Sequence, residues 1–556
     1  MAERSKMRSG GQLIVDALEA NGCQRIFCIP GESYLAVLDA LHDSPIQTIV
    51  CRNEGGAAMM ADAHGKLTGD PGICFVTRGP GATNASHGVH IAAQDSTPMI
   101  LFIGQIARRI REREAFQEVD YRQFFGGMAK WVAEIDDAAR IPEFVTRAYA
   151  IATSGRPGPV VLALPEDMLR DVVTSPKPLA HVPVAAALGT EAVAKFGRLI
   201  AAAKSPIAIL GGSRWTAKSV LAFQQFAERF HLPVGCSFRR QMLFDHLHPC
   251  YAGDVGIGIN PALGKRIKDA DLVLLLGGRM SEMPSSDYTL LKSPYPDQTL
   301  VHVHPDPSEL GRVYRSALPI CAAPSDFTEA LAILPSPSST LSWTADTAQA
   351  HEEYLKWSTP PETGPGPVTM GPIMNFLETE LPDDAILCNG AGNYATWVHR
   401  FHRFRNYGTQ AAPTSGSMGY GVPAAVAAKL LHPDKTVVAF AGDGCFQMNG
   451  QEFATAMQYG ASIIVIVIDN GIYGTIRMHQ ERDYPGRVSG TDLKNPDFAA
   501  LARAHGGHGE TVEKTEDFAP AFKRARDCGM PAIIHVKLDP EAITPTRTLS
   551  QIRGSV

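Results

Sequence analysis

The sequence repeats one local pattern many times: a short apolar run rich in β-branched residues, then a glycine-rich turn, then a stretch of helical composition. The runs are almost continuously apolar rather than alternating, which is typical of parallel strands buried on both faces. They are Ile73–Arg78, Met99–Gln105, Pro159–Pro165, Pro206–Gly212, Leu272–Gly278, Leu300–Asp306, Ala385–Gly390, Thr436–Gly442, Ile463–Asn470 and Ala532–Asp539. Strand, turn and helix in this order predict doubly wound α/β sheets.

Two segments rich in proline and small residues divide the chain into domains. At roughly 150 residues per domain, 556 residues suggest three or four domains. The segments are 175–186 and 334–371, and such compositions behave as linkers. We therefore predict three doubly wound parallel-sheet domains, at 1–180, 190–345 and 366–556.

Composition and charge exclude several classes of protein. With 45% hydrophobic and 19% charged residues, the chain is not of the disordered or coiled-coil type. Its net charge of −6 argues against broad nucleic-acid binding. No apolar run reaches the roughly 18 residues of a membrane span, and residues 1–6 lack the apolar core of a signal peptide. The ten cysteines form no C-x-x-C pair, so we expect reduced, buried thiols in a cytoplasmic protein.

Polar residues follow two successive strands of the predicted third domain. Thr436–Gly442 leads into Asp443-Gly444, and Ile463–Ile468 leads into Asp469-Asn470. The spacing from Asp443 to Asn470 is that of one strand–helix–strand unit, so both stand at the carboxyl ends of parallel strands, where such sheets bind ligands. A carboxylate, an amide oxygen and a backbone carbonyl suit Mg²⁺ shared with a phosphate. A Gly-Asp-Gly sequence alone is usually just a turn; the asparagine at this spacing makes a magnesium site the stronger interpretation.

This pattern resembles the cofactor-binding motif of thiamine-diphosphate-dependent enzymes. The resemblance implies that Asp443, Asn470 and the carbonyl of Ile472 hold Mg²⁺, and that Gly444 lies close to the diphosphate. The family's usual Asn-Asn pair is Asp469-Asn470 here, so only its first member departs from the motif.

Two glycine-rich segments upstream extend the resemblance. Ser415–Pro423 opens a helix and by itself is either a nucleotide-type turn or an ordinary tight turn. In the family this segment lies under the cofactor, which implies that Ser417 contacts thiamine diphosphate and that Met418 supports its bent conformation. The turn after strand Ala385–Cys388 supplies diphosphate contacts in the family, and we assign Asn393 to that role.

Glu54 follows strand Gln47–Arg52 and precedes two glycines and two alanines. A glutamate in such a place is most often solvated or caps a helix. In the family, this strand–Glu–Gly pattern surrounds the acid that hydrogen-bonds N1′ of the cofactor and promotes loss of the C2 proton. The resemblance therefore makes Glu54 a catalytic and cofactor-binding residue. It also implies that two subunits of a homodimer or homotetramer share each active site.

Several further segments resemble the acetolactate synthase branch, large catalytic subunit type. They are Ile29–Gly31, Gly79–Asn84, Gly104–Gln105, Ala115–Glu118, Gly155–Val160 and Asn495–Phe498. The resemblance places Phe116 and Gln117 near the reacting atoms, with Gln117 steering bound intermediates. For Phe116 alone, core packing is the alternative.

Other positions depart from the synthases. Glu32 stands where a second glycine is usual, and Thr77-Arg78-Gly79 lacks the paired histidines of simple decarboxylases. His479 aligns with a tryptophan that shapes the pocket for the second 2-oxo acid. We place Thr475 and His479 in the substrate pocket; the alternative is that the side chains of Arg477 and His479 lie outside the helix.

The middle domain carries a weaker nucleotide signal. Gly211-Gly212 and Gly277-Gly278-Arg279 follow strands, and an arginine can pair with a phosphate. Synthases bind FAD in this domain, but their later charged pair is missing here. FAD, ADP or no nucleotide are the alternatives.

The sequence predicts a transferase or lyase that uses thiamine diphosphate and Mg²⁺ and acts on a 2-oxo acid or related carbonyl, with acetolactate-synthase-like carboligation as the first choice. A 2-oxo acid decarboxylase, or an acyloin or aldehyde lyase or carboligase, is the second. A non-catalytic binder is disfavoured because Glu54, Asp443 and Asn470 are all present. Donor, acceptor and any regulatory subunit are left open.

Overall fold

The computed structural model describes residues 6–184 and 188–554, and it contains three parallel sheets of six strands each. The first sheet has the order β3-β2-β4-β5-β7-β6, and all of its pairs are parallel. Its strands are β2 (Arg25–Cys28), β3 (Gln47–Val50), β4 (Gly72–Val76), β5 (Met99–Gln105), β6 (Trp131–Glu134) and β7 (Pro159–Pro165). The doubly wound α/β prediction is therefore confirmed for this part of the chain.

Helices and one small ribbon complete this region. The chain enters through β1 (Lys6–Ser9), which pairs antiparallel with β8 (Val172–Ser175). The helices are α1 (Gly10–Ala20), α2 (Leu35–His42), α3 (Glu54–Thr68), α4 (Pro80–Asp95), α5 (Tyr121–Phe125) and α6 (Ile141–Thr153). Helix α3 is buried along almost its whole length, which explains its many glycines and alanines: small residues let neighbouring backbones approach closely.

The central sheet has the order β11-β10-β9-β12-β13-β14, again all parallel. Its strands are β9 (Pro206–Leu210), β10 (Val234–Ser237), β11 (Tyr251–Val255), β12 (Leu272–Leu276), β13 (Thr299–His304) and β14 (Leu318–Cys321). Its helices are α7 (Thr190–Ala202), α8 (Ala217–Arg229), α9 (Pro261–Asp269), α10 (Pro324–Ala330) and α11 (Thr344–Trp357). The connections diverge between β9 and β12, the strand pair at which such sheets bind ligands.

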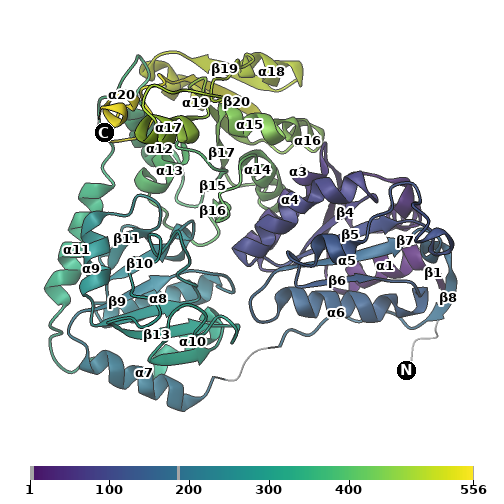
Figure 1. Ribbon diagram of the computed structural model, residues 1–556, viewed down its shortest axis with the longest axis horizontal. Helices are drawn as coiled ribbons and strands as arrows, with labels where there is room; N and C mark the ends of the chain where they lie inside the picture. The colour runs from purple at the N-terminus through teal and green to yellow at the C-terminus, as the bar shows by residue number, and fades with distance from the viewer. Residues whose placement is uncertain (1–5, 185–187, 555–556) are drawn as a thin grey trace. The chain divides into compact units, whose positions relative to one another are not determined.

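The third sheet has the order β16-β15-β17-β18-β20-β19 and is also parallel (Figure 1). Its strands are β15 (Ile386–Asn389), β16 (Gln410–Ala411), β17 (Val437–Gly442), β18 (Ile464–Asp469), β19 (His508–Val512) and β20 (Ala532–Lys537). Its helices are α12 (Met370–Glu380), α13 (Ala395–Phe401), α14 (Gly421–Leu431), α15 (Asp443–Asn449), α16 (Phe453–Gln458), α17 (Gly474–Asp483), α18 (Phe498–Ala504), α19 (Thr515–Asp527) and α20 (Leu549–Arg553). When the strands of each sheet are numbered along the chain, the first and third sheets share the order 2-1-3-4-6-5. The sequence analysis found no internal repeat that would predict this shared topology.

By packing, the chain forms two compact units. One contains residues 1–184, 419–433 and 447–463, and the other contains the remainder. Helix α14 therefore packs with the first unit, against α3, although its sequence lies between strands of the third sheet (Figure 1). The predicted boundaries 1–180, 190–345 and 366–556 stay a prediction; the end of the segment 175–186 lies outside the described residues.

Two sequence-based expectations need correction. The segment 334–371 is not a linker throughout, because α11 lies inside it and buries Thr347, Ala350 and Tyr354. Its apolar positions are too sparse to stand out between the proline-rich stretches. All ten cysteines are free, but Cys321 is exposed rather than buried, and Cys23 and Cys528 are partly exposed. Within residues 6–184 and 188–554, no helix has both the length and the apolar character needed to cross a membrane.

Candidate active site

Asp443 and Asn470 lie together at one edge of the third sheet. Asp443 begins α15 directly after β17, Asn470 follows β18, and the two strands are parallel neighbours. The Gly471 N–H donates to Asp443 Oδ2 at 3.0 Å, so the backbone after Asn470 contacts the carboxylate. Asn470 Oδ1 accepts from the Ile472 N–H at 3.3 Å, which fixes the amide. The structure thus brings together the three residues predicted to hold Mg²⁺.

Asp469, the departure from the usual motif, is embedded among donors. Lys537 Nζ and His535 Nε2 lie 2.7 and 2.8 Å from its Oδ2, and Asn495 Nδ2 and the Gly471 N–H donate to its Oδ1. Burial alone would raise the pKa of Asp469, but the hydrogen bonds from His535, Lys537 and Asn495 outweigh it and hold the pKa below its ordinary value. The extra negative charge of Asp469 is therefore paired with Lys537 and His535.

Asn495 is a site residue that the sequence did not single out. Its Nδ2 donates to Asp443 Oδ2 at 2.6 Å and to Asp469 Oδ1 at 2.7 Å, so one amide joins the two carboxylates. Burial, together with the charge of Asp469, raises the pKa of Asp443 to about 6. The segment Asn495–Phe498 matched the family pattern, and this bridge is a physical reason for the asparagine within it.

Asn393 joins the turn after β15 to helix α17. Its Oδ1 accepts from Thr475 Oγ1 at 2.8 Å, and its Nδ2 donates to the Ile543 carbonyl at 3.1 Å. At the start of the same turn, the Gly390 N–H donates to Tyr394 Oη, which contacts Cys445 Sγ of α15. These contacts therefore join the turns after β15 and β17.

Ser417 and Met418 precede α14. The Ser417 hydroxyl, almost buried, donates to the Met418 carbonyl at 3.0 Å. Met418 is partly buried and packs against the apolar core of the third sheet. Its side chain is thus held by protein on one side, which agrees with a supporting role.

Glu54 is the first residue of α3, and the helix is capped instead by Asn53, whose Oδ1 accepts from the Gly55 N–H. The Glu54 carboxylate is half-buried and accepts from Asn84 Nδ2 at 3.0 Å. The capping alternative for Glu54 is therefore wrong, since Asn53 fills that place.

The loop carrying Phe116 and Gln117 is held by its own polar groups. The Glu118 carboxylate accepts from the N–H groups of Glu112 and Ala115, and Gln117 takes the left-handed backbone conformation at φ 64°. Phe116 is 74% exposed, so the core-packing alternative is wrong. An exposed aromatic on a fixed loop is free to meet a ligand or another chain.

Two departures from the synthase pattern compensate each other. Arg78, in the turn that lacks the paired histidines, donates to Glu32 Oε1 at 2.8 Å, and Glu32 stands in place of the usual glycine. Arg78 also pairs with Glu166. The arginine is nearly buried, so these two carboxylates supply the countercharges it needs there.

Arg477 and His479, which the sequence analysis considered together, have different surroundings on helix α17. Arg477 donates to Thr491 Oγ1 and Asp492 Oδ1, so its charge is paired. His479 lies four residues after Thr475 and thus on the same helix face, the face that meets Asn393. Its Nδ1 is buried without a hydrogen-bond partner. The burial of this nitrogen disfavours the alternative in which the side chains of both Arg477 and His479 lie on the outside of the helix.

Packing within the central domain explains why glycine occupies positions 211 and 212. A side chain at Gly212, where φ is 69°, would meet the Gly277 carbonyl at 1.9 Å. Trp215 Nε1 donates to the Gly211 carbonyl, and Arg240 Nε donates to that of Gly212. Gly211, Gly212 and Arg279 do follow the two strands at which the connections diverge, but the glycines do not require a nucleotide, and FAD stays a prediction.

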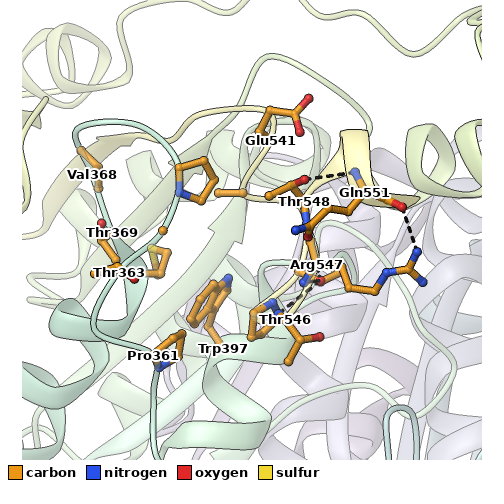
Figure 2. Close-up of a pocket in the computed structure, with 16 residues that line it drawn as sticks. Pro361, Thr363, Val368, Thr369, Trp397, Glu541, Thr546, Arg547, Thr548 and Gln551 are labelled. Atoms are coloured by element: carbon orange, nitrogen blue, oxygen red, sulfur yellow. Dashed lines mark hydrogen bonds between the residues drawn. The ribbon is translucent and has the colours of Figure 1, made fainter. Parts of the chain in front are cut away.

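A separate cavity of about 160 Å³ opens beside α13 (Figure 2). It is lined by parts of 361–370, by Trp397, and by parts of 541–551, where Thr548 and Gln551 cap α20. None of the predicted site residues lines it, so it does not carry the site.

The oxygen atoms at Asp443, Asn470 and Ile472 fit a hard divalent cation, because a carboxylate, an amide and a carbonyl are the ligands Mg²⁺ prefers. In the described part of the chain, no three or more His, Cys, Asp or Glu side chains gather as a metal site. The predicted set has a single carboxylate and is of a different kind.

Comparison with known proteins agrees with this arrangement. Three family models match the chain: the thiamine pyrophosphate enzyme N-terminal TPP-binding domain at 8–124, the central domain at 193–331, and the C-terminal TPP-binding domain at 390–536. The acetolactate synthase isozyme 2 large subunit of Escherichia coli is 30% identical, over 96% of each chain. The acetolactate synthase large subunit of Corynebacterium glutamicum is 33% identical, over 93% of this chain and 85% of its own. The chain therefore belongs to the thiamine pyrophosphate enzymes and is similar to acetolactate synthase large subunits.

Proposed function

We propose that this enzyme uses Mg²⁺-bound thiamine diphosphate to join a 2-oxo acid, after loss of CO₂, to an acceptor carbonyl. The observation that carries the proposal is the contact between Asp443 and the backbone after Asn470, which assembles an oxygen-ligand site at the carboxyl ends of β17 and β18. The similarity to acetolactate synthase large subunits supports the carboligation.

When bound, thiamine diphosphate would supply a carbon acid whose conjugate base can add to a carbonyl, and a ring that can accept the electrons left by departing CO₂. Asp443, Asn470 and the Ile472 carbonyl would hold the metal, and Asn393 with Ser417 would contact the diphosphate side. Met418 would pack against the cofactor from the core of the third sheet. Glu54 would hold a proton at N1′, with Asn84 fixing its carboxylate.

The acceptor is where we propose that this chain differs from the synthases. His479 replaces the tryptophan of the synthase pocket and carries a buried nitrogen without a partner. A histidine is smaller and can hydrogen-bond, so it would favour a more polar or bulkier carbonyl partner than a second pyruvate. Gln117 and Phe116, from the loop after β5, would contact the reacting groups. As the resemblance to the family implies, we also propose a homodimer or homotetramer in which two subunits share each active site.

The test is an assay of purified protein with thiamine diphosphate and Mg²⁺ over a panel of 2-oxo acids, each with and without aldehyde or 2-oxo acid acceptors. We expect cofactor-dependent CO₂ release together with a coupled product. CO₂ release with free aldehyde as the sole product would instead establish a decarboxylase.

A second experiment isolates Glu54. Glu54→Gln keeps the size of the side chain but cannot supply the acid proton, so we expect exchange of the cofactor's C2 hydrogen with deuterium to slow by roughly 10²- to 10⁴-fold. Wild-type exchange in this variant would remove Glu54 from the mechanism.

A further inference from the structure

The turn that delivers Glu54 is held by a side chain encoded 400 residues later. Glu452 ends a short 3₁₀ turn (Gly450–Glu452) that leads into α16, and it is fully buried. Its Oε1 accepts from the N–H groups of Arg52 at 3.0 Å and Asn53 at 2.9 Å. Its Oε2 accepts from Thr455 Oγ1 at 2.6 Å. Glu452, Arg52 and Asn53 all belong to the first compact unit.

The N–H groups of Arg52 and Asn53 do not belong to a helix or a strand. Strand β3 ends at Val50 and α3 begins at Glu54, so Arg52 and Asn53 lie in the irregular turn between them. A backbone N–H in such a turn needs an acceptor when it is taken from water. Glu452 supplies it immediately before Glu54, and a carboxylate is the strongest acceptor a side chain can offer.

Other side chains from the same segment hold the same turn. Tyr459 Oη accepts from the Val50 N–H at 2.7 Å and donates to the Thr48 carbonyl at 3.0 Å. Arg52 donates to Gln458 Oε1 at 2.6 Å. Residues 452–459 thus contact the chain from the middle of β3 to the cap of α3.

The Glu452 carboxylate packs directly against Gly56. A side chain at Gly56 would stand 2.4 Å from Glu452 Oε1 and 2.8 Å from its Cδ. Gly56 lies one helical position beyond Gly55, whose N–H is capped by Asn53. Of the two glycines after Glu54, Gly56 is therefore explained by packing: its lack of a side chain leaves space for the Glu452 carboxylate at the start of α3.

We propose that Glu452 is a positioning residue for Glu54. It acts as a hydrogen-bond acceptor that fixes the Arg52–Asn53 backbone and thereby the direction in which the Glu54 carboxyl leaves α3. It does not touch the cofactor or exchange a proton with it. This inference rests on the proposed role of Glu54 in activating thiamine diphosphate, and the experiment below separates the two.

The experiment measures deuterium exchange at C2 of bound thiamine diphosphate, and the affinity for that cofactor, in Glu452→Ala and Glu452→Gln. We expect Glu452→Ala to slow exchange roughly 10- to 100-fold, since a displacement of about 1 Å costs this much. Cofactor affinity should change by less than about threefold, because the proposed metal and diphosphate contacts lie elsewhere. Glu452→Gln should exchange at nearly the wild-type rate, because its amide oxygen can still accept both N–H groups.

Thr347→Val is the control for lost stability. Its hydroxyl is buried in the central domain, where it donates to the carbonyls of His231 and Trp343. It should lower the melting temperature without changing the exchange rate. Glu54→Gln is measured in parallel. If Glu54→Gln exchanges at the wild-type rate, the proposed function is rejected. If Glu54→Gln is slow but Glu452→Ala exchanges at the wild-type rate, only the role of Glu452 is rejected.

Two further results would overturn the proposal. If Glu452→Gln were as slow as Glu452→Ala, the charge or the proton of Glu452 would matter rather than its position as an acceptor.

If Glu452→Ala does not fold, Gly56→Ala replaces it, because the added methyl displaces the carboxylate from the two N–H groups. Slow exchange in Gly56→Ala supports the positioning role, and wild-type exchange refutes it.

Discussion

Asp443 is the one charged ligand in the proposed magnesium site, and it is almost buried. Asp443→Ala should weaken Mg²⁺-dependent binding of thiamine diphosphate by about 100-fold or more, because the other two proposed ligands, an amide and a carbonyl, are neutral. Titration calorimetry with the cofactor at fixed Mg²⁺ measures this directly. Asp434→Ala, at an exposed aspartate three residues before β17, is the control, and equal affinity in both variants would place the metal elsewhere.

His479 is the residue on which we expect product choice to depend. His479→Trp restores the side chain of the synthases on the helix face that Thr475 shares. We expect the native enzyme to make little acetolactate from pyruvate and the variant to make several-fold more, at the scale of 1–3 kcal/mol by which pocket contacts discriminate substrates. Chromatography of the products decides this. Tyr484→Trp, at the exposed end of α17, should leave the distribution unchanged.

At the scale of elements, helix α17 is tied to the end of the chain. Arg553 of α20 forms two hydrogen bonds of 2.7 Å with Glu481, and Leu549 and Ile552 pack in one apolar cluster with Ile472 and Ile543. Because Ile543 also meets Asn393, the C-terminal segment helps to hold the turn after β15. Helix α20 is short, so its stability must come from these contacts rather than from its own backbone.

This attachment should be sensitive to acid. The hydrogen bond from Arg553 lowers the pKa of Glu481 to about 2, from an ordinary value of 4.5. A carboxyl with a depressed folded pKa stabilises the attached state above its unfolded pKa, and the gain is lost as pH falls from about 4.5 toward 2. The protection of the amides of 549–553 against hydrogen exchange, corrected for the intrinsic rate and compared with that of α12, should therefore be lower at pH 3 than at pH 6. Glu481→Gln should show the same release at pH 6; equal protection in the variant would contradict it.

At the scale of the whole molecule, the first unit is built from distant parts of the sequence. Segments 419–433 and 447–463 pack with residues 1–184, and α3 buries its face against α14. A fragment of residues 1–184 should therefore expose apolar surface, bind a hydrophobic dye and aggregate, whereas the complete chain should not. A monomeric fragment with the thermal stability of the complete chain would show that the added segments are dispensable.

The sequence predicted the parts that local patterns encode. Strands such as β12 and β18 were found because both faces are buried and all of their residues, apart from Asp469 at the end of β18, are apolar. Short strands such as β10 and β14 were missed, since four residues hardly differ from a loop. The closeness of Asp443 and the turn after Asn470 was predicted because a single strand–helix–strand unit separates them. Asn495 was recognised only as part of a matching segment, without its contacts, and Glu452 was not recognised, because the partners of both lie far away in the chain.

The link between Glu452 and the turn before Glu54 has a consequence for synthesis on the ribosome. At roughly 5–20 residues per second, the 400 residues that separate Glu452 from Arg52 take about 20–80 s to translate. During that time the start of α3 has been made but its acceptor has not, so the nascent N-terminal region stays incompletely packed until the segment with Glu452 has been translated. Chaperones that bind apolar chain should therefore meet this protein early and release it late.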